Sequence, residues 1–227
     1  QDGPRLSLLD RIEEIGADNA ALQACESQVE DIFPCTPLQS AMLGETAQNQ
    51  HAYCNEIELR IAPGFAAADV EAAVIQVVNA NEILRTGFTL WDGRHMAVLF
   101  KRFPDTIRLV STFTEDLDFT APSEFLRPFR VQVKSSADGA AQSVLIQAHH
   151  ATYDGWSADM MLADITALLQ GAAMPPRPQF REVALYHVGD HITTANDSAR
   201  SFWSEQFLGW NRTPFPKLVA RRSQNTI

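Results

Sequence analysis

Long apolar runs, paired cysteines and an export signal are absent from this chain of 227 residues. No stretch approaches the ~20 apolar residues that cross a bilayer. Residues 1–9 lack a basic region followed by an apolar run, so we expect neither a membrane span nor a signal peptide. Cys25, Cys35 and Cys54 have no CxxC spacing, which argues against a disulfide framework and a zinc site. These absences predict a cytoplasmic protein with reduced thiols and no bound metal.

Positive charge is also scarce. Lys and Arg number 18 against 28 Asp and Glu, which gives a net charge of −10 at pH 7. Nucleic-acid binding depends on clustered Lys and Arg, so we exclude nucleic acid as a partner. The chain has no glycine-rich phosphate loop, and without a GxSxG elbow a serine nucleophile has little support.

The composition is that of a globular protein, with 45% hydrophobic and 20% charged residues. Residues 1–28 are predicted to form a linker or an initial helix. Helical patterns cover about residues 8–16, 37–48, 69–78, 157–170, 179–191 and 198–208, and strand patterns cover about residues 56–61, 84–90, 96–100, 129–134 and 143–149. Hairpins occur among irregularly interleaved helices and strands. This order favours an α+β fold, a mixed β-sheet flanked by helices, over a doubly wound parallel sheet.

The sharpest local signal is the sequence TPLQ at residues 36–39. Thr36 can cap free backbone N–H groups, Pro37 suits a first helical turn, and Gln39 can reach back to the cap residue. A capping box at the start of a helix is therefore predicted here.

Chemically useful residues gather where an apolar strand ends, in the sequence SVLIQAHHATYDGWS at residues 143–157. Side chains alternate between the two faces of a strand, so His149 and His150 should point apart. Adjacent residues that point apart cannot easily hold one metal ion. The pattern favours one working histidine and one structural histidine, and imidazole is the side chain best suited to proton transfer near neutral pH.

The residues after the histidines suggest a supported loop. Asp154 follows a buried strand and should be paired or hydrogen-bonded, with Arg85 as one candidate partner. Gly155 can adopt backbone geometry closed to other residues and leaves room for a substrate. Ser157 is expected to cap the following helix.

These residues resemble the condensation domains of nonribosomal peptide synthetases, which have the chloramphenicol-acetyltransferase-like fold. HHATYDG at residues 149–155 matches their HHxxxDG motif, and Trp156 and Ser157 continue the match. FPCTPLQSAML at residues 33–43 and ILRTGF at residues 83–88 resemble the first and second motifs, in the required order. The family's second motif usually opens with an Arg-His pair, whereas this chain has NANE at residues 79–82. All three motifs are most similar to those of fungal synthetases, for which siderophore assembly is one expected pathway.

The resemblance implies a role for each site residue. His150 takes the catalytic position as general base or orienting group for an acceptor amine that attacks a thioester, and Gly155 lies beside the reacting groups. His149, Asp154 and Arg85 support the site, with the aspartate held by an arginine. Trp156 and Ser157 are assigned to the substrate tunnel.

The resemblance also implies partners and boundaries. Donor and acceptor carrier domains would present their substrates on phosphopantetheine arms, with no other cofactor bound. Residues 29–175 would form the N-terminal lobe, and residues 176–227 would form a connector and last helices leading to a missing C-terminal lobe. Adjacent synthetase modules are further expected partners, and this chain alone should be inactive. Three alternatives remain open: a terminal cyclising domain, a non-catalytic carrier-docking module and an acyltransferase that uses coenzyme A.

Overall fold

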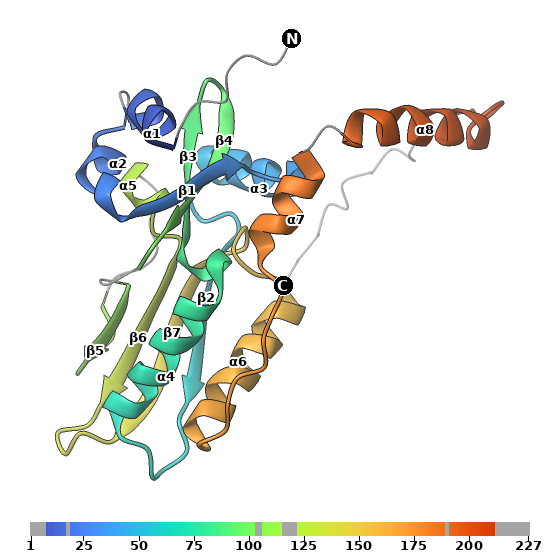
Figure 1. Cartoon of the computed structure of the whole chain (residues 1–227). Helices are drawn as coiled ribbons and strands as arrows, with labels where there is room; N and C mark the ends of the chain where they lie inside the picture. The colour runs from blue at the N-terminus through green and yellow to red at the C-terminus, as the bar shows by residue number, and fades with distance from the viewer. Residues whose placement is uncertain (1–7, 17–18, 103–105, 115–121, 189–190, 212–227) are drawn as a thin grey trace, which may run out of the picture. The chain divides into compact units, whose positions relative to one another are not determined.

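The computed structural model describes residues 8–16, 19–102, 106–114, 122–188 and 191–211 (Figure 1). The chain divides into two compact units, residues 1–189 and 190–227. The helices of the first unit are α1 (Leu8–Gly16), α2 (Ala20–Ala24), α3 (Pro37–Gln48), α4 (Ala67–Ala80), α5 (Pro122–Phe125), α6 (Gly155–Leu169) and α7 (Phe180–Val188). Its strands are β1 (Val29–Pro34), β2 (Cys54–Arg60), β3 (Thr86–Trp91), β4 (Arg94–Phe100), β5 (Ile107–Val110), β6 (Phe129–Ser135) and β7 (Ala141–His149). In the second unit, the described element is α8 (His191–Gln206).

One sheet of the first unit has three antiparallel strands in the order β1-β4-β3. The β3–β4 hairpin turns at Asp92 and Gly93, whose φ angles are 46° and 68°. Two consecutive positive φ angles are typical of the tight turns that match strand twist. Residues of α1 and α2 share a core cluster with this sheet, in which Ile12, Ile15 and Leu22 pack with residues such as Ile32 and Val98.

The second sheet has four strands in the order β2-β7-β6-β5. The β5–β6 pair is parallel and the other pairs are antiparallel, so the predicted α+β fold with a mixed sheet is confirmed. The valines predicted as the apolar face of a helix lie on α4, where Val70, Val74 and Val77 are buried. They pack with Val144 and Ile146 of β7, and the partly buried side of α6 joins the same core (Figure 1).

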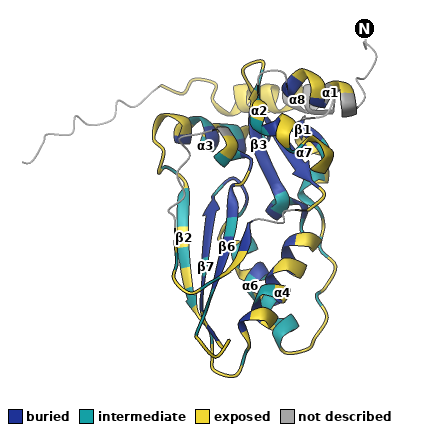
Figure 2. Cartoon of the chain, turned by 90° about the vertical axis from the view of Figure 1, so that its left-hand side faces the viewer, coloured by how far each residue is buried: buried dark blue, intermediate teal, exposed yellow. Residues whose placement is uncertain are grey.

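Burial follows this arrangement. The central strands β6 and β7 are largely buried, whereas β2 alternates between half-buried and exposed residues (Figure 2). The alternation in β2 is the pattern that predicted a half-buried strand at residues 56–61.

Several boundaries differ from the predictions. Residues Glu82–Arg85 form a 3-10 helix, so β3 begins at Thr86 and not at Leu84. The helix predicted at 157–170 begins at Gly155. The strands β1 and β5 were not predicted, whereas the helix α2 falls within the range 1–28 predicted as a linker or an initial helix, part of which lies outside the described residues. Among the described residues, no helix is long and apolar enough to cross a membrane.

Candidate active site at the end of β7

The HHATYDG segment leaves the sheet between the neighbours of β7. The backbone N–H of His149 donates to Pro128 O at 2.8 Å, and that of His150 donates to Tyr53 O at 2.8 Å. Sheet-like pairing therefore continues to the second histidine, after which the chain turns towards α6.

His149 is completely buried and tied at both ring nitrogens. Its Nε2 lies 2.8 Å from Thr46 Oγ1, and its Nδ1 accepts the backbone N–H of Ala151 at 3.0 Å. Because Nδ1 accepts, Nε2 carries the ring proton and donates it to Thr46. Burial, and to a smaller degree the charge of His150, lowers the pKa of His149 to about 4. His149 is therefore a neutral structural group at physiological pH.

His150 has a different environment. It is half-buried, and its ring stacks on that of Tyr153, with 5.0 Å between centroids and 13° between planes. Its Nδ1 is buried without a hydrogen-bond partner among the described residues. His150 also lines a cavity of about 710 Å³, whereas His149 is not among the lining residues. The two imidazoles thus separate as the strand alternation predicted.

Four sequence segments converge on this cavity. The start of α3 contributes Pro37, Leu38 and Met42 from the first motif, and Ile83 comes from the second. The third motif and α6 supply Trp156 and Ser157, both expected near the substrate, together with Met160. A wall from α7, formed by Phe180, Val183 and His187, was missed by the sequence analysis. The helical pattern at 179–191 located this helix but carried no signal that it faces the site.

Asp154 does not pair with Arg85, which corrects that expectation. It is exposed and caps α6, where its Oδ1 accepts the backbone N–H of Ser157 at 2.8 Å and the Ser157 hydroxyl at 2.7 Å. These hydrogen bonds stabilise the carboxylate and lower the pKa of Asp154. The cap is therefore Asp154, and Ser157 is its capping-box partner rather than the cap itself.

Gly155 is open rather than conformationally special. Its φ lies outside the left-handed region, and a Cβ built on it meets no atom within 4 Å. The room expected beside the reacting groups is present, but the expected backbone requirement is not.

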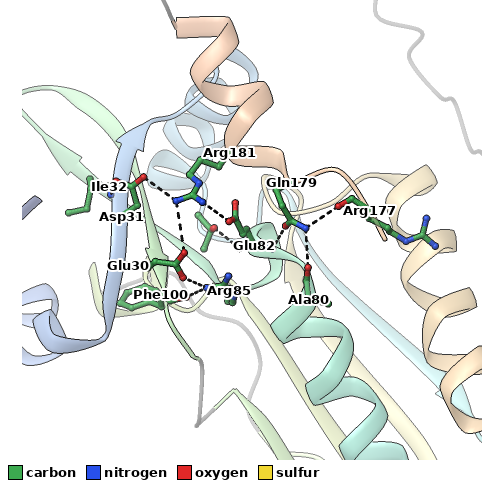
Figure 3. Close-up of polar contacts among 11 residues, drawn as sticks. Glu30, Asp31, Ile32, Ala80, Glu82, Arg85, Phe100, Arg177, Gln179 and Arg181 are labelled. Atoms are coloured by element: carbon green, nitrogen blue, oxygen red, sulfur yellow. Dashed lines mark hydrogen bonds and ion pairs between the residues drawn. The ribbon is translucent and has the colours of Figure 1, made fainter. Parts of the chain in front are cut away.

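Arg85 lies in a polar network away from the cavity (Figure 3). Its Nη1 pairs with Glu30 Oε2 at 2.7 Å and also donates to Phe100 O. Next to it, Arg181 of α7 pairs with Glu82 at 2.8 Å and with Asp31 at 3.3 Å. Arg85 of the second motif thus links β1 and β4, and Glu82, just before the motif, links to α7.

Two other kinds of chemistry, metal binding and thiol nucleophiles, have little support in the described part of the chain. No group of three or more His, Cys, Asp or Glu residues in it could hold a metal ion. Burial raises the pKa of Cys35 to about 12 and that of Cys54 to about 11, so both remain thiols and are poor nucleophiles. Of the two histidines in the HHATYDG segment, His150 is the candidate for proton transfer in the cavity.

Comparison with known proteins decides the family. The model of the condensation domain family matches residues 29–227. This chain belongs to that family. It is 38% identical over 201 residues to nonribosomal peptide synthetase 2 of Gibberella zeae, covering 88% of this chain and 4% of that protein. It is 33% identical over 221 residues to nonribosomal peptide synthetase SIDC of Beauveria bassiana, covering 95% of this chain and 4% of that protein.

Solved condensation domains share the fold. The condensation domain of the monacolin K polyketide synthase MokA matches with a TM-score of 0.62 and 15% identity, over 82% of this chain and 44% of that one. The starter condensation domain of rhizomide synthetase RzmA matches with a TM-score of 0.63 and 14% identity, over 81% of this chain and 49% of that one. The chain thus spans about half of each solved condensation domain and a small part of each synthetase.

Proposed function

We propose that this chain is the N-terminal lobe of a condensation domain that joins a carrier-bound acyl or aminoacyl thioester to an acceptor amine. Membership of the family supports the reaction class. One observation carries the assignment to a residue: His150, and not His149, lines the cavity.

The chemistry requires little of the protein. The amine nitrogen attacks the thioester carbonyl carbon, the C–N bond forms, the C–S bond breaks, and the donor arm leaves as a thiol. His150 accepts the proton that the amine loses and returns it to the departing sulfur, or it orients the amine for attack. Holding both arms in one cavity supplies much of the rate by proximity, with Trp156 and Ser157 beside the substrates.

The proposed partners are the donor and acceptor carrier domains with their phosphopantetheine arms, a second lobe that completes the cavity, and adjacent synthetase modules. The coverage of solved condensation domains supports the second lobe, because this chain spans only 44% and 49% of the two described above. The synthetase relatives, of which the chain spans 4%, support the surrounding modules.

The complete synthetase that contains this chain, supplied with loaded donor and acceptor carriers, tests the proposal. His150→Ala should lower the rate of amide formation by about 10²–10⁴-fold, because it removes the proton-transfer group. The matched control is His51→Ala, since His51 is exposed and does not line the cavity. Parent-level turnover by His150→Ala would overturn the catalytic role of His150.

A coenzyme A thioester is a second candidate donor. One solved relative, the R148A mutant of the RzmA starter condensation domain, is described as a complex with C8-CoA, with a TM-score of 0.62 and 15% identity to this chain. The same assay with acyl-coenzyme A in place of the loaded donor carrier separates the two donors. Product that forms equally fast from either donor would favour the acyltransferase, and a cyclic product from one loaded carrier would favour the cyclising domain.

A further inference from the structure

The helix α3 contacts the HHATYDG loop through two buried polar side chains. Gln39 Nε2 donates to Ala151 O at 3.0 Å, and Thr46 Oγ1 accepts from His149 Nε2 at 2.8 Å. Gln39 is 4% exposed and Thr46 is 0% exposed. Seven residues correspond to about two helical turns, so both side chains project from the same face of α3.

Gln39 serves the helix and the loop at once. Its Oε1 accepts the backbone N–H of Thr36 at 3.0 Å in the capping box, while its amide nitrogen binds the carbonyl of Ala151. The start of α3 and the residue after His150 are therefore joined by a single side chain.

Thr46 is connected to the backbone N–H of Ala151 through His149. The Thr46 hydroxyl has one proton to donate, to Met42 O at 2.9 Å or Ala52 O at 2.8 Å, and so is free to accept the Nε2 proton of His149. That contact fixes the tautomer in which His149 Nδ1 accepts the N–H of Ala151 at 3.0 Å.

The carbonyl and the N–H of Ala151 are therefore both hydrogen-bonded, the carbonyl directly to Gln39 and the N–H to His149, which Thr46 orients. On the opposite side, the N–H of His150 is held by Tyr53 O at 2.8 Å. The backbone on both sides of His150 is thus fixed before any substrate arrives. A side chain carried on backbone that is held in this way needs less reorganisation at the moment of reaction.

We infer that Gln39 and Thr46 are positioning residues for His150, through which α3 sets the direction of the working imidazole in the cavity. The inference rests on the proposed role of His150. It also explains why the first motif, which contributes Gln39, accompanies the third. Gln39 also lines the cavity, whereas Thr46 does not and can act only through His149.

Two variants of the complete synthetase remove the contacts, and two controls preserve the surroundings. Thr46→Val keeps the shape but removes the hydroxyl, whereas Thr46→Ser keeps the hydroxyl. Gln39→Glu can still accept from Thr36 but cannot donate to Ala151, so the capping box survives. Gln48→Met changes an exposed glutamine of the same helix.

Hydrogen-exchange mass spectrometry of the peptide around residues 150–154 gives a readout that does not depend on turnover. Thr46→Val and Gln39→Glu should each speed amide exchange in this peptide by about tenfold, since each removes a buried hydrogen bond. They should also lower kcat for amide formation by about 10–100-fold, with the KM for the acceptor carrier unchanged. Thr46→Ser and Gln48→Met should match the parent in both measurements.

The outcomes separate this inference from the proposed function. Two outcomes overturn the positioning role. In the first, amide exchange in Thr46→Val and Gln39→Glu stays at the parent level. In the second, exchange is faster but their kcat equals that of Gln48→Met, while His150→Ala is impaired. If exchange is faster in Thr46→Val and Gln39→Glu but His150→Ala turns over at the parent rate, the catalytic role of His150 is overturned. The inference that Gln39 and Thr46 position a catalytic side chain is then overturned with it. Loss of folding in Thr46→Val leaves the decision to Gln39→Glu, which retains the helix cap.

Discussion

The protonation of His149 makes stability depend on pH. Its pKa is lowered to about 4 in the folded protein, whereas histidine in an unfolded chain titrates near 6.5. As the pH falls through 6.5, the unfolded state takes up a proton that the folded state refuses, so the free energy of unfolding decreases until about pH 4. The contribution is fully present above pH 6.5 and amounts to about 3 kcal/mol.

Denaturant unfolding of the complete condensation domain between pH 4 and 7 measures this effect. His149→Gln should flatten the dependence, because the group that titrates differently in the two states is gone. His51→Gln, at an exposed position, should leave the slope of the parent unchanged. A His149→Gln profile as steep as that of the parent would contradict the neutral, buried state of His149.

Two glycines of the motifs, Gly87 and Gly155, differ in the space available for a side chain. A Cβ on Gly87 would lie 2.5 Å from Leu126 O and 2.6 Å from Leu126 Cα, whereas one on Gly155 meets nothing within 4 Å. Gly87→Ala should therefore force a backbone shift and lower the free energy of unfolding by about 1–3 kcal/mol. Gly155→Ala should change it by less than about 0.5 kcal/mol. Thermal and denaturant unfolding of both variants checks this, and equal stabilities would refute it.

Individual residues differ in how far the sequence predicts their surroundings. The separation of His149 from His150 follows from strand alternation alone, because the strand does continue to His149. The Asp154–Arg85 pair was wrong because ion-pair partners depend on tertiary placement, and Arg85 lies against Glu30. The cap at Asp154 had a local signal, since a serine three residues later can return the hydrogen bond.

At the scale of elements, local chemistry separates the predicted segments from the missed ones. The helix α3 was predicted with its bounds because Thr36 and Gln39 form the capping box, and α4 was located by the period of its valines. The strand β1 was missed because its sequence, VEDIFP, is short, partly charged and ends in proline, all features of an edge strand. The strand β5 has four residues and pairs in parallel with β6, a contact for which the sequence gives no local signal.

The missed edge strand explains how α7 is held at the cavity. Asp31 of β1 and Glu82 both pair with Arg181, and Gln179 Oε1 accepts the N–H of Glu82 at 2.9 Å. Two residues before Gln179, Arg177 forms two hydrogen bonds of 2.6 Å to the buried Asp164 of α6. Figure 3 shows Arg177 beside this network. Polar contacts on the outer side thus orient the apolar wall formed by Phe180 and Val183.

At the scale of the whole molecule, we predict that this chain folds but does not turn over when it is isolated. It spans about half of the solved condensation domains it matches, and the proposed reaction needs two arms enclosed together. A second lobe would supply the remaining wall and exclude water, which strengthens the hydrogen bonds made in the cavity.

The assay compares the isolated chain with the complete condensation domain, using the same loaded carriers. Far-UV circular dichroism and a cooperative thermal transition establish that the isolated chain is folded, so that inactivity cannot be assigned to unfolding. Amide product should then stay at the level of carriers without enzyme. Turnover close to that of the complete domain would mean that one lobe assembles the whole reacting centre. The cavity beside His150 would then be a self-sufficient active site, and the need for a second lobe would be refuted.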